Sequence, residues 1–384
     1  MLFKLTDEQK MIRNMVREFS RKVVAAKAAE RDQTKEFPAD NFQQMGELGL
    51  MGMMVPEAYG GESADTVSYV LALSEIAYSC ASTSVVMSVQ NSIVCESLNN
   101  FGTEEQKQQY LKPLASGEII GAFGLTEPDA GSDPVSQTAT AVKDKGHFVI
   151  NGTKRFITSG KHAKLVLVTA KTDPDAGHKG ISCFIVPKGT KGLIVGHEED
   201  KMGLRASDTT DLIFEDCRVP VSQMLGKQGD GFKIAMSGLD SGRIGIAAQS
   251  LGVAQAAFDA AVKYASKRRQ FGVPITKHQA IRFQIADMAT QIEAARQLVF
   301  SAASMKDRKE PYTREASIAK LFASEMVNEI TARAIQMHGG YGFTKDYVVE
   351  RLYRDARVFT IYEGTSEIQR IVISNNILKD KRKG

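Results

Sequence analysis

The chain has 384 residues, of which 43% are hydrophobic and 24% are charged, and this balance excludes a largely disordered protein. Its length allows two or three domains with a sizeable core. The net charge is only +4 and the basic residues are spread along the chain, so we do not expect nucleic acid as a main partner.

The first third of the chain predicts helices. Thr6 and Gln9 have the spacing of a capping box, and apolar residues then recur at helical spacing up to Val23. Further helical runs cover residues 40–51, 64–79, 84–100 and 104–115, with a turn-forming stretch at residues 56–61. We therefore predict an N-terminal helical domain over residues 1–118.

A change to strand spacing follows at about residue 119. Glycine, proline, asparagine and aspartate separate short apolar runs over residues 119–125, 138–142, 148–150, 165–168, 181–186, 192–196 and 211–214. Asn151-Gly152 predicts a hairpin turn directly after the third of these runs. Because no helix intervenes, we predict a central domain over residues 119–228 that is built on an antiparallel sheet or a small barrel.

Long helical patterns return after this domain, over residues 244–266, 278–306, 313–338 and 366–378. Alanine recurs at positions 254, 257, 261 and 265, which suits close packing between helices. Residues 229–384 are therefore predicted to form a C-terminal four-helix bundle. The predicted fold class is mainly α with a central β domain.

Several well-known site motifs are absent from the sequence. It contains no GxxxxGK[ST], strand-borne GxGxxG, HExxH or GxSxG motif, and its six histidines lack the spacing of metal ligands. P-loop, Rossmann, zinc-hydrolase and α/β-hydrolase sites are therefore excluded, and no metal is expected. The four cysteines have no CxxC spacing, which favours buried thiols in a reducing compartment. The N-terminus lacks an apolar segment and no run of 18 apolar residues occurs, so we expect neither secretion nor a membrane span.

Two loops after predicted strands carry hydroxyl groups, glycines and free backbone N–H groups. They are FGLTEPDAGSD at residues 123–133 and FITSG at residues 156–160. Such loops can bind a planar polar ring or phosphate groups. The same composition is also typical of an ordinary turn between strands.

A third polar segment, YEGTSEIQ at residues 362–369, precedes the last predicted helix. Thr365, or Ser366 together with Gln369, can cap that helix. Glu363 lies outside the helix after apolar residues, where partial desolvation would raise its pKa toward that of a useful base. A solvated loop glutamate is the alternative interpretation.

Charged pairs and helix ends supply further candidates. Asp240 and Arg243 share one helix face, either as a surface ion pair or as a clamp for an anionic, purine-bearing ligand. RRQFG at residues 268–272 and QMHGG at residues 336–340 end helices, where arginines complement the helix dipole and glycines form C-caps. The histidines at positions 278 and 338 are interpreted as structural, because no carboxylate or cysteine adjoins them in sequence.

Together these segments resemble the acyl-CoA dehydrogenase family of flavoproteins across essentially the whole chain. The resemblance rests on FGLTEPDAGSD, FITSG, LDSGRIGIAAQ, RRQFG, HQA, QMHGGYGFTKDYVVERLYRDAR and IYEGTSEIQR, in that order. Short-chain, butyryl-CoA-type members are the most similar. The resemblance implies an N-terminal helical domain, a middle antiparallel β domain and a C-terminal four-helix bundle, with FAD bound between the last two.

The resemblance also implies which residues bind FAD. Those that match family positions around the flavin ring and the phosphates are Phe123, Leu125, Thr126, Gly131, Ser132, Phe156, Ile157 and Thr158, with Thr158 near N5. Those that match contacts to the FAD of a neighbouring subunit are Arg268, Phe271, Gln279, Gln336, Gly339 and Gly340. Thr365 and Glu367 match positions near the adenosine. These contacts imply a homotetramer built as a dimer of dimers.

Glu363 matches the catalytic base of the family. The resemblance implies that it removes the α-proton of an acyl-CoA while hydride passes from the β-carbon to flavin N5, which gives a trans-2-enoyl-CoA. Reduced FAD is then reoxidised by electron-transferring flavoprotein. Gly242 stands where some members carry the base, and it cannot act as one. The residues that match substrate contacts are Ser132, Asp240, Arg243, Tyr362 and Gly364.

The expected substrate is a short- or medium-chain monocarboxylic acyl-CoA. Glutaryl-CoA members carry an arginine where this chain has Ser84, and no arginine occurs between Arg31 and Arg155. A dicarboxylic acyl group would therefore leave a buried charge unpaired. The alternatives are a branched, cyclic or glutaryl-type acyl-CoA, transfer of the electrons to oxygen, and a non-catalytic acyl-CoA-binding protein. We expect a cytoplasmic protein, or a processed chain in the mitochondrial matrix.

Overall fold

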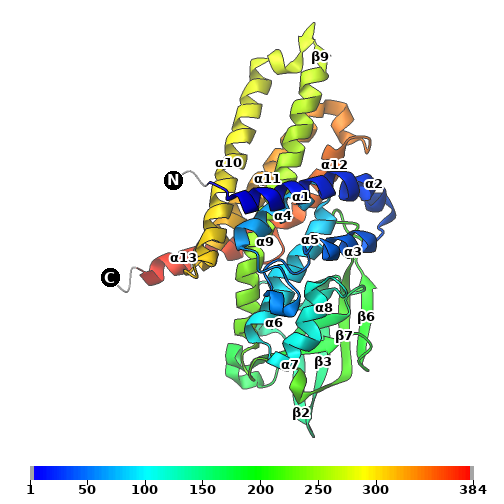
Figure 1. The fold of residues 1–384 in the computed structure, drawn as a ribbon, viewed down its shortest axis with the longest axis vertical. Coiled ribbons are helices and arrows are strands. Elements are labelled where there is room, and N and C mark those ends of the chain that lie inside the picture. The colour runs from blue at the N-terminus through cyan, green and yellow to red at the C-terminus, as the bar shows by residue number, and fades with distance from the viewer. Residues whose placement is uncertain (1–3, 381–384) are drawn as a thin grey trace.

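Helices form the N-terminal part of the computed structural model, which describes residues 4–380 (Figure 1). They are α1 (Asp7–Phe19), α2 (Ala25–Thr34), α3 (Ala39–Glu47), α4 (Thr66–Ser79), α5 (Ala81–Ser88), α6 (Glu96–Phe101), α7 (Glu104–Gln106) and α8 (Lys112–Ala115). Thr6 and Gln9 form the predicted capping box, in which the Thr6 hydroxyl accepts from the Gln9 N–H at 3.1 Å. The helices predicted in this region are confirmed, and the loop between α3 and α4 contains the predicted turn.

An eight-stranded sheet follows, and it is mixed. Its strands are β1 (Gly121–Gly124), β2 (Thr140–Asp144), β3 (His147–Thr158), β4 (Leu165–Lys171), β5 (Ile181–Pro187), β6 (Leu193–Glu198), β7 (Thr209–Pro220) and β8 (Met224–Leu225). Their order is β6-β7-β3-β2-β4-β5-β8, with β1 paired to β4. Most neighbours are antiparallel, but β4 runs parallel to both β1 and β2. The predicted antiparallel pairing is therefore wrong for these two pairs. The connection from β1 to β4 covers residues 125–164 and contains the β2–β3 hairpin, and it is long enough to return the chain parallel to β1.

The turn between β2 and β3 lies at Lys145-Gly146, so the turn predicted at Asn151-Gly152 is wrong. Lys145 and Gly146 have φ of 44° and 81°, and a two-residue hairpin turn favours positive φ at both positions. Asn151 and Gly152 lie inside β3, where its register with β7 shifts. The Asn151 side chain accepts from the Asp216 N–H at 2.7 Å. The extra residue of this β-bulge lies on β7, where Asp216 has φ of 45°, and Asn151 and Gly152 stand opposite it.

Long helices form the C-terminal part. They are α9 (Gly231–Lys267), α10 (Gln279–Asp307), α11 (Thr313–His338), α12 (Val348–Ala356) and α13 (Ser366–Asp380). The four predicted helices are present, and α11 packs against α9, α10 and α13. The short helix α12 was not predicted, and α9 begins well before residue 244. Figure 1 shows α9 and α10 extending to a tip at the opposite end of the molecule from the sheet, where β9 (Arg269–Gln270) and β10 (Val273–Pro274) form a hairpin.

One apolar core joins the N-terminal helices to the bundle. Tyr69 and Leu73 of α4 belong to the same buried cluster as Ile246 of α9. The two helices approach so closely that a Cβ on Gly252 would overlap the Ser74 carbonyl oxygen. The four cysteines are free and buried, as predicted. Between residues 4 and 380, no helix is both long and apolar enough to cross a bilayer.

Candidate active site

Glu363 lies in the turn that precedes α13, with an enclosed carboxylate. Its Oε2 is shielded from solvent and accepts no hydrogen bond within the described residues. Desolvation raises the pKa of Glu363 to about 7, although the positive charges of Lys320 and Arg243 act in the opposite direction. A carboxyl group with such a pKa is about half ionised at neutral pH and can act as a general base.

Gly242 of α9 makes room for this carboxylate. A Cβ on residue 242 would lie 2.1 Å from Glu363 Oε2, far inside van der Waals contact. Any larger residue at this position would therefore displace the carboxylate or push α9 away. Position 242 of α9 is thus in direct contact with the Glu363 carboxylate.

The backbone at Glu363 is strained and firmly held. Glu363 and Gly364 have φ of 52° and 92°, a conformation that costs energy in a residue other than glycine. The Gly364 carbonyl oxygen accepts from Lys320 Nζ at 2.7 Å and from Gln369 Nε2 at 2.9 Å. These two donors stabilise a turn that would otherwise relax.

Thr365 is the residue that caps α13. Its hydroxyl accepts from the Ile368 N–H at 3.4 Å. A capping box between Ser366 and Gln369 does not form, because the Gln369 side chain donates instead to the turn before the helix. Of the two caps that the sequence left open, the structure has the one at Thr365.

Asp240 and Arg243 form a partly buried ion pair, in which Arg243 is buried and Asp240 is half-buried. The Arg243 guanidinium, only 4% exposed, donates to Asp240 Oδ1 at 2.5 Å, and the Thr313 hydroxyl donates to Oδ2 at 2.6 Å. Desolvation raises the pKa of Asp240 and lowers the pKa of Arg243. Arg243 Nε has no partner within residues 4–380, so one buried donor is unused.

A neutral polar network lies behind Tyr362, the residue before Glu363. The Tyr362 hydroxyl donates to Gln249 Oε1 at 2.5 Å. Gln249 Nε2 donates to Ser84 Oγ and to the Ala81 carbonyl oxygen, both at 2.9 Å. Gln249 and Ser84 are fully buried. The network thus satisfies its own polar groups and contains no charge.

The two polar loops of the β domain lie side by side. The Arg155 N–H, next to FITSG, donates to the carbonyl oxygen of Thr126 in FGLTEPDAGSD at 2.8 Å. The hydroxyls of Thr126, Ser132 and Thr158 have no hydrogen-bond partner in the described part of the chain, so they are free for a ligand. The other predicted residues of these loops are the buried Ile157, the half-buried Phe123 and Leu125, and the exposed Gly131 and Phe156.

A buried ion pair, which was not predicted from the sequence, holds the first loop. Lys154 Nζ donates to Glu127 Oε1 at 2.8 Å, and both side chains are buried. Burial lowers the pKa of Lys154 to about 8, against the effect of the Glu127 charge. Lys154 continues the inward-facing series of Phe148 and Ile150 along β3, and this alternation was the signal that could have revealed it.

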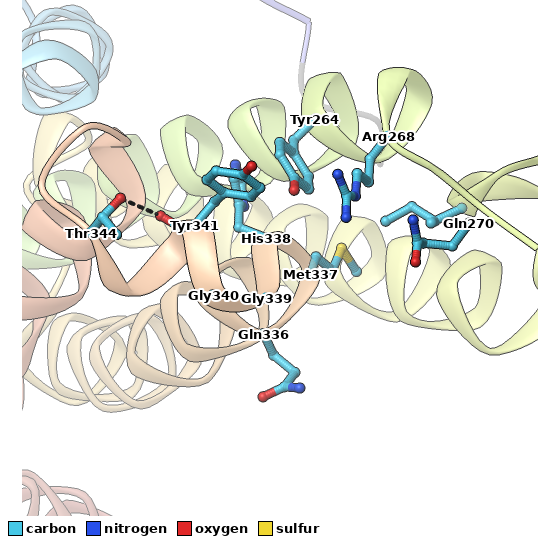
Figure 2. A pocket seen from close by; sticks show the side chains of 11 residues that line it. Tyr264, Arg268, Gln270, Gln336, Met337, His338, Gly339, Gly340, Tyr341 and Thr344 are labelled. Carbon is cyan, nitrogen blue, oxygen red and sulfur yellow. Dashed lines mark hydrogen bonds between the residues drawn. The ribbon is translucent and has the colours of Figure 1, made fainter.

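At the tip, α9 and the end of α11 line a cavity of about 460 Å³. Figure 2 shows Tyr264 and Arg268 of α9 facing His338 and Tyr341, while the Gln336 side chain points away from them. The rings of Tyr264 and His338 stack with centroids 4.3 Å apart. The orientation of the His338 ring is fixed by a hydrogen bond within its own helix, since its Nδ1 lies 2.7 Å from the Ala334 carbonyl oxygen.

The remaining predicted residues of the tip are exposed. No heavy atom lies within 4 Å of a Cβ built on Gly339 or Gly340, so the backbone there is open to a ligand. Phe271, in the hairpin, is 93% exposed, and Gln279 is exposed at the start of α10. A second cavity, of about 300 Å³, lies at the start of α13 and is lined by residues that include Thr365, Glu367 and Arg357.

Comparison with known proteins identifies the family. Residues 6–118, 122–217 and 229–378 match, respectively, the N-terminal, middle and C-terminal domains of acyl-CoA dehydrogenase. The chain belongs to the acyl-CoA dehydrogenase family. It is therefore an oxidoreductase of a flavin-dependent family, and the resemblance found in the sequence is confirmed.

Its relatives include short-chain enzymes. The short-chain specific acyl-CoA dehydrogenase of Clostridium acetobutylicum is 50% identical, over 98% of this chain and 100% of that protein. The structure of butyryl-CoA dehydrogenase from Megasphaera elsdenii is 43% identical with a TM-score of 0.97, over 98% of this chain and 100% of that one. A chain from a structure of the electron transferring flavoprotein of Acidaminococcus fermentans is 49% identical with the same TM-score and coverage.

The residues that the family resemblance singled out fall into three groups in this acyl-CoA dehydrogenase. Glu363, its turn and the Asp240–Arg243 pair form the first group, and the two β-domain loops form the second. The tip residues form the third, at the opposite end of the molecule from the sheet (Figure 1). A single chain therefore does not bring the tip and the β-domain loops together.

Lys320 of α11 contacts the first group and was not predicted from the sequence. It is fully buried and lies on the same helix face as Ala316, Ala323 and Val327. Lys320 lies four residues after Ala316, three before Ala323 and seven before Val327, so it stands within an apolar stripe at helical spacing. This lysine in an apolar stripe was the signal that could have revealed it.

Proposed function

We propose that this enzyme converts a short- or medium-chain monocarboxylic acyl-CoA to a trans-2-enoyl-CoA, with Glu363 as the base that removes the α-proton. The observation that carries the proposal is the enclosed carboxylate beside Gly242, where desolvation raises the pKa of Glu363 to about 7. The α-proton of a thioester is weakly acidic, so its removal needs both a matched base and stabilisation of the developing enolate oxygen.

The strained turn also offers donors for that oxygen. The backbone N–H groups of Glu363 and Gly364 have no acceptor among residues 4–380. Because two hydrogen bonds hold the Gly364 carbonyl, these N–H groups keep a fixed direction. Preorganised donors of this kind stabilise charge that develops in a transition state. We assign this role to the turn.

The chain carries groups that fit FAD. When bound, FAD supplies the two-electron acceptor for the hydride that leaves the β-carbon. The unpartnered hydroxyls of Thr126, Ser132 and Thr158 suit a polar ring and phosphates, as does the open backbone at Gly131. The cavity at the tip, with Arg268 and its open glycines, suits the dinucleotide of a second copy. The full set assigned to FAD is Phe123, Leu125, Thr126, Gly131, Ser132, Phe156, Ile157, Thr158, Arg268, Phe271, Gln279, Gln336, Gly339, Gly340, Thr365 and Glu367.

The residues on one face of α9 are the evidence for a short- or medium-chain acyl group. Gly242 lies against Glu363, Gly245 faces the hydroxyls of Tyr69 and Ser88 one turn later, and Gln249 closes the face with its buried network. Seven residues of helix span about 10 Å, a length that a short- or medium-chain acyl group fills. The CoA portion would leave in the other direction along α9, where Asp240 precedes Gly242.

A monocarboxylic acyl group suits the neutral network at the closed end. Ser84, which stands where glutaryl-type members carry an arginine, accepts a hydrogen bond from Gln249 and offers no positive charge. A second carboxylate at that end would be buried without a partner. Branched, cyclic and glutaryl-type substrates remain the alternatives that a substrate series would reveal.

The electron acceptor that we propose is electron-transferring flavoprotein. Support comes from the similarity to a chain in the Acidaminococcus fermentans structure of such a flavoprotein. The proposed assembly is a homotetramer, because the tip residues need a second chain to complete a dinucleotide site with the β-domain loops. A cytoplasmic location agrees with four free, buried cysteines.

Anaerobic titration of the purified holoenzyme with butyryl-CoA tests the proposal. The flavin absorbance should bleach while enoyl-CoA forms, and the rate should rise with pH through about 7 as Glu363 ionises. Glu363→Gln should retain FAD and lose at least about 10²-fold of the reduction rate, as expected on removal of a general base. Normal reduction by Glu363→Gln would refute the role of Glu363, and a colourless protein would favour the non-catalytic alternative.

A further inference from the structure

Lys320 is an unusual lysine, since its ammonium group is fully buried without a carboxylate partner. Within residues 4–380 its Nζ donates to the Gly364 carbonyl oxygen at 2.7 Å and forms no ion pair. Burying a charge is costly unless other groups compensate for lost solvation. A neutral residue of similar size would pack at this position without that cost, so the charge needs a reason.

The carbonyl that Lys320 binds belongs to the strained turn of Glu363. Gln369 Nε2 donates to the same oxygen at 2.9 Å and to the Glu363 carbonyl oxygen at 3.2 Å. Two side chains thus donate hydrogen bonds to the turn, and only Lys320 carries a charge. Comparison of Lys320 with Gln369 therefore separates the effect of the hydrogen bond from the effect of the charge.

We propose that Lys320 is a positioning residue for the Glu363 base: it fixes the Glu363–Gly364 turn through its hydrogen bond and places a buried positive charge near the carboxylate. The inference rests on the proposed function of Glu363. It adds to that function a residue on α11 that acts on the reaction only through the base.

The other ionisable groups near Glu363 are either paired or neutral. Arg243 of α9 is paired with Asp240 at 2.5 Å. The tyrosines near the carboxylate, Tyr69 of α4 and Tyr362, have pKa values raised by burial and are neutral at pH 7. Glu325 of α11 and Glu367 of α13 also act on Lys320 by charge, and both are exposed to solvent.

The electrostatic effect has a definite sign. Both cations lower the pKa of Glu363, with Lys320 the larger influence, and burial raises it. Burial also lowers the pKa of Lys320 to about 8, so the ammonium is mostly charged at pH 7. Loss of that charge would raise the pKa of Glu363 further, and less of the base would be ionised at neutral pH.

The test compares three holoenzyme variants by stopped-flow flavin reduction at saturating butyryl-CoA between pH 5.5 and 9.5. Lys320→Gln keeps an N–H donor and loses the charge, Lys320→Arg keeps the charge, and Gln369→Met removes only the neutral donor. We expect the apparent pKa of reduction in Lys320→Gln to rise by about one unit, which lowers the rate at pH 7 about fivefold and restores it at high pH. Lys320→Arg should keep the wild-type pKa, and Gln369→Met should lower the rate without moving the pKa.

Each other outcome is decisive. A wild-type pKa in Lys320→Gln, or an equal pKa shift in Gln369→Met, would overturn the electrostatic role. Lys320→Met serves as a second uncharged variant, and failure of both uncharged variants to fold while Lys320→Arg folds would make Lys320 a purely structural residue. If the wild-type flavin is not reduced by butyryl-CoA, the proposed function fails instead. If wild type is reduced and Glu363→Gln is not, a negative result with Lys320 concerns this inference alone.

Discussion

At the scale of single residues, the environment of Glu363 decides its chemistry. The same side chain in water would be fully ionised at neutral pH and a weak base. Enclosure by α9, α11 and its own turn raises its pKa to about 7, and two buried cations limit the rise. The result is a carboxylate that can accept a proton near neutral pH.

Gly242→Ala tests how closely the carboxylate is fitted. The added Cβ would lie 2.1 Å from Glu363 Oε2, so the carboxylate has to move. We expect the rate of flavin reduction by butyryl-CoA to fall by about 10²-fold, as is typical of a displacement of about 1 Å at a reacting group. Stopped-flow absorbance measures the rate, and the flavin content should stay unchanged.

Gly238→Ala is the matched control, one turn earlier on the same buried helix. Its added Cβ would lie 3.3 Å from Ser97 Oγ and would not touch Glu363. It should reduce at a rate near that of wild type. Similar losses in both variants would mean that α9 tolerates no added methyl group and that the fit to Glu363 is not the cause.

At the scale of elements, α9 provides both the space for the Glu363 carboxylate and the closed end of the proposed acyl site. Its glycines at 242 and 245 lie on the same face as Gln249. The helices α4 and α5 and the turn before α13 contribute the groups that meet this face. The proposed acyl site thus depends on how α9 packs, not on any one loop.

Gln249→Ala should lengthen the acyl site. Removal of the side chain opens the end that its hydrogen bonds to Ser84 and Tyr362 close. Two further methylenes buried in that space are worth about 1.6 kcal/mol, so the kcat/KM for hexanoyl-CoA relative to butyryl-CoA should rise about tenfold. Steady-state kinetics with an artificial electron acceptor measure this ratio.

Gln255→Ala on the same helix is the control for this change. Its side chain bonds Asp259 and Arg296 on the outer face, away from Glu363. The chain-length preference should not move in this variant. An unchanged preference in Gln249→Ala would show that Gln249 does not limit the length of the acyl chain.

At the scale of the whole molecule, the tip exposes large aromatic side chains to solvent. Phe271 is 93% exposed and Phe343 is 89% exposed, next to the cavity lined by Arg268 and Tyr341. Large exposed aromatic side chains in one region indicate an interface. In the proposed tetramer, a second copy of the chain covers these aromatic side chains.

Phe343→Asp should break this assembly. A charge in place of a ring that the proposed interface would bury would destabilise that interface, and we expect the tetramer to dissociate with loss of most of the FAD. Light scattering coupled to size-exclusion chromatography measures the mass, and the ratio of flavin to protein absorbance measures the cofactor. Val142→Asp, on an exposed site of β2, is the control and should stay tetrameric. A wild-type monomer that retains FAD would contradict the assembly.

Most of the fold was predictable because its signals are local. Helical spacing predicted the four long bundle helices, and alternating runs located the strands. Errors arose where pairing between distant strands decides the outcome. Asn151-Gly152 has the composition of a turn, but pairing with β7 keeps it inside β3, opposite a bulge in β7. The parallel pairing of β1 with β4 likewise depends on contacts that no short window contains.

The sequence alone was enough for the family and for the chemical type of each candidate group, because the motifs occur in one order over the whole chain. The ionisation of Glu363, the burial of Arg243 beside Asp240, and the contact of Lys320 with Gly364 were decided only by tertiary structure. These properties depend on solvent exclusion and on charges brought together from α9, α11 and the last turn. A residue's neighbours in space, not its neighbours in sequence, set the free energy of its charge.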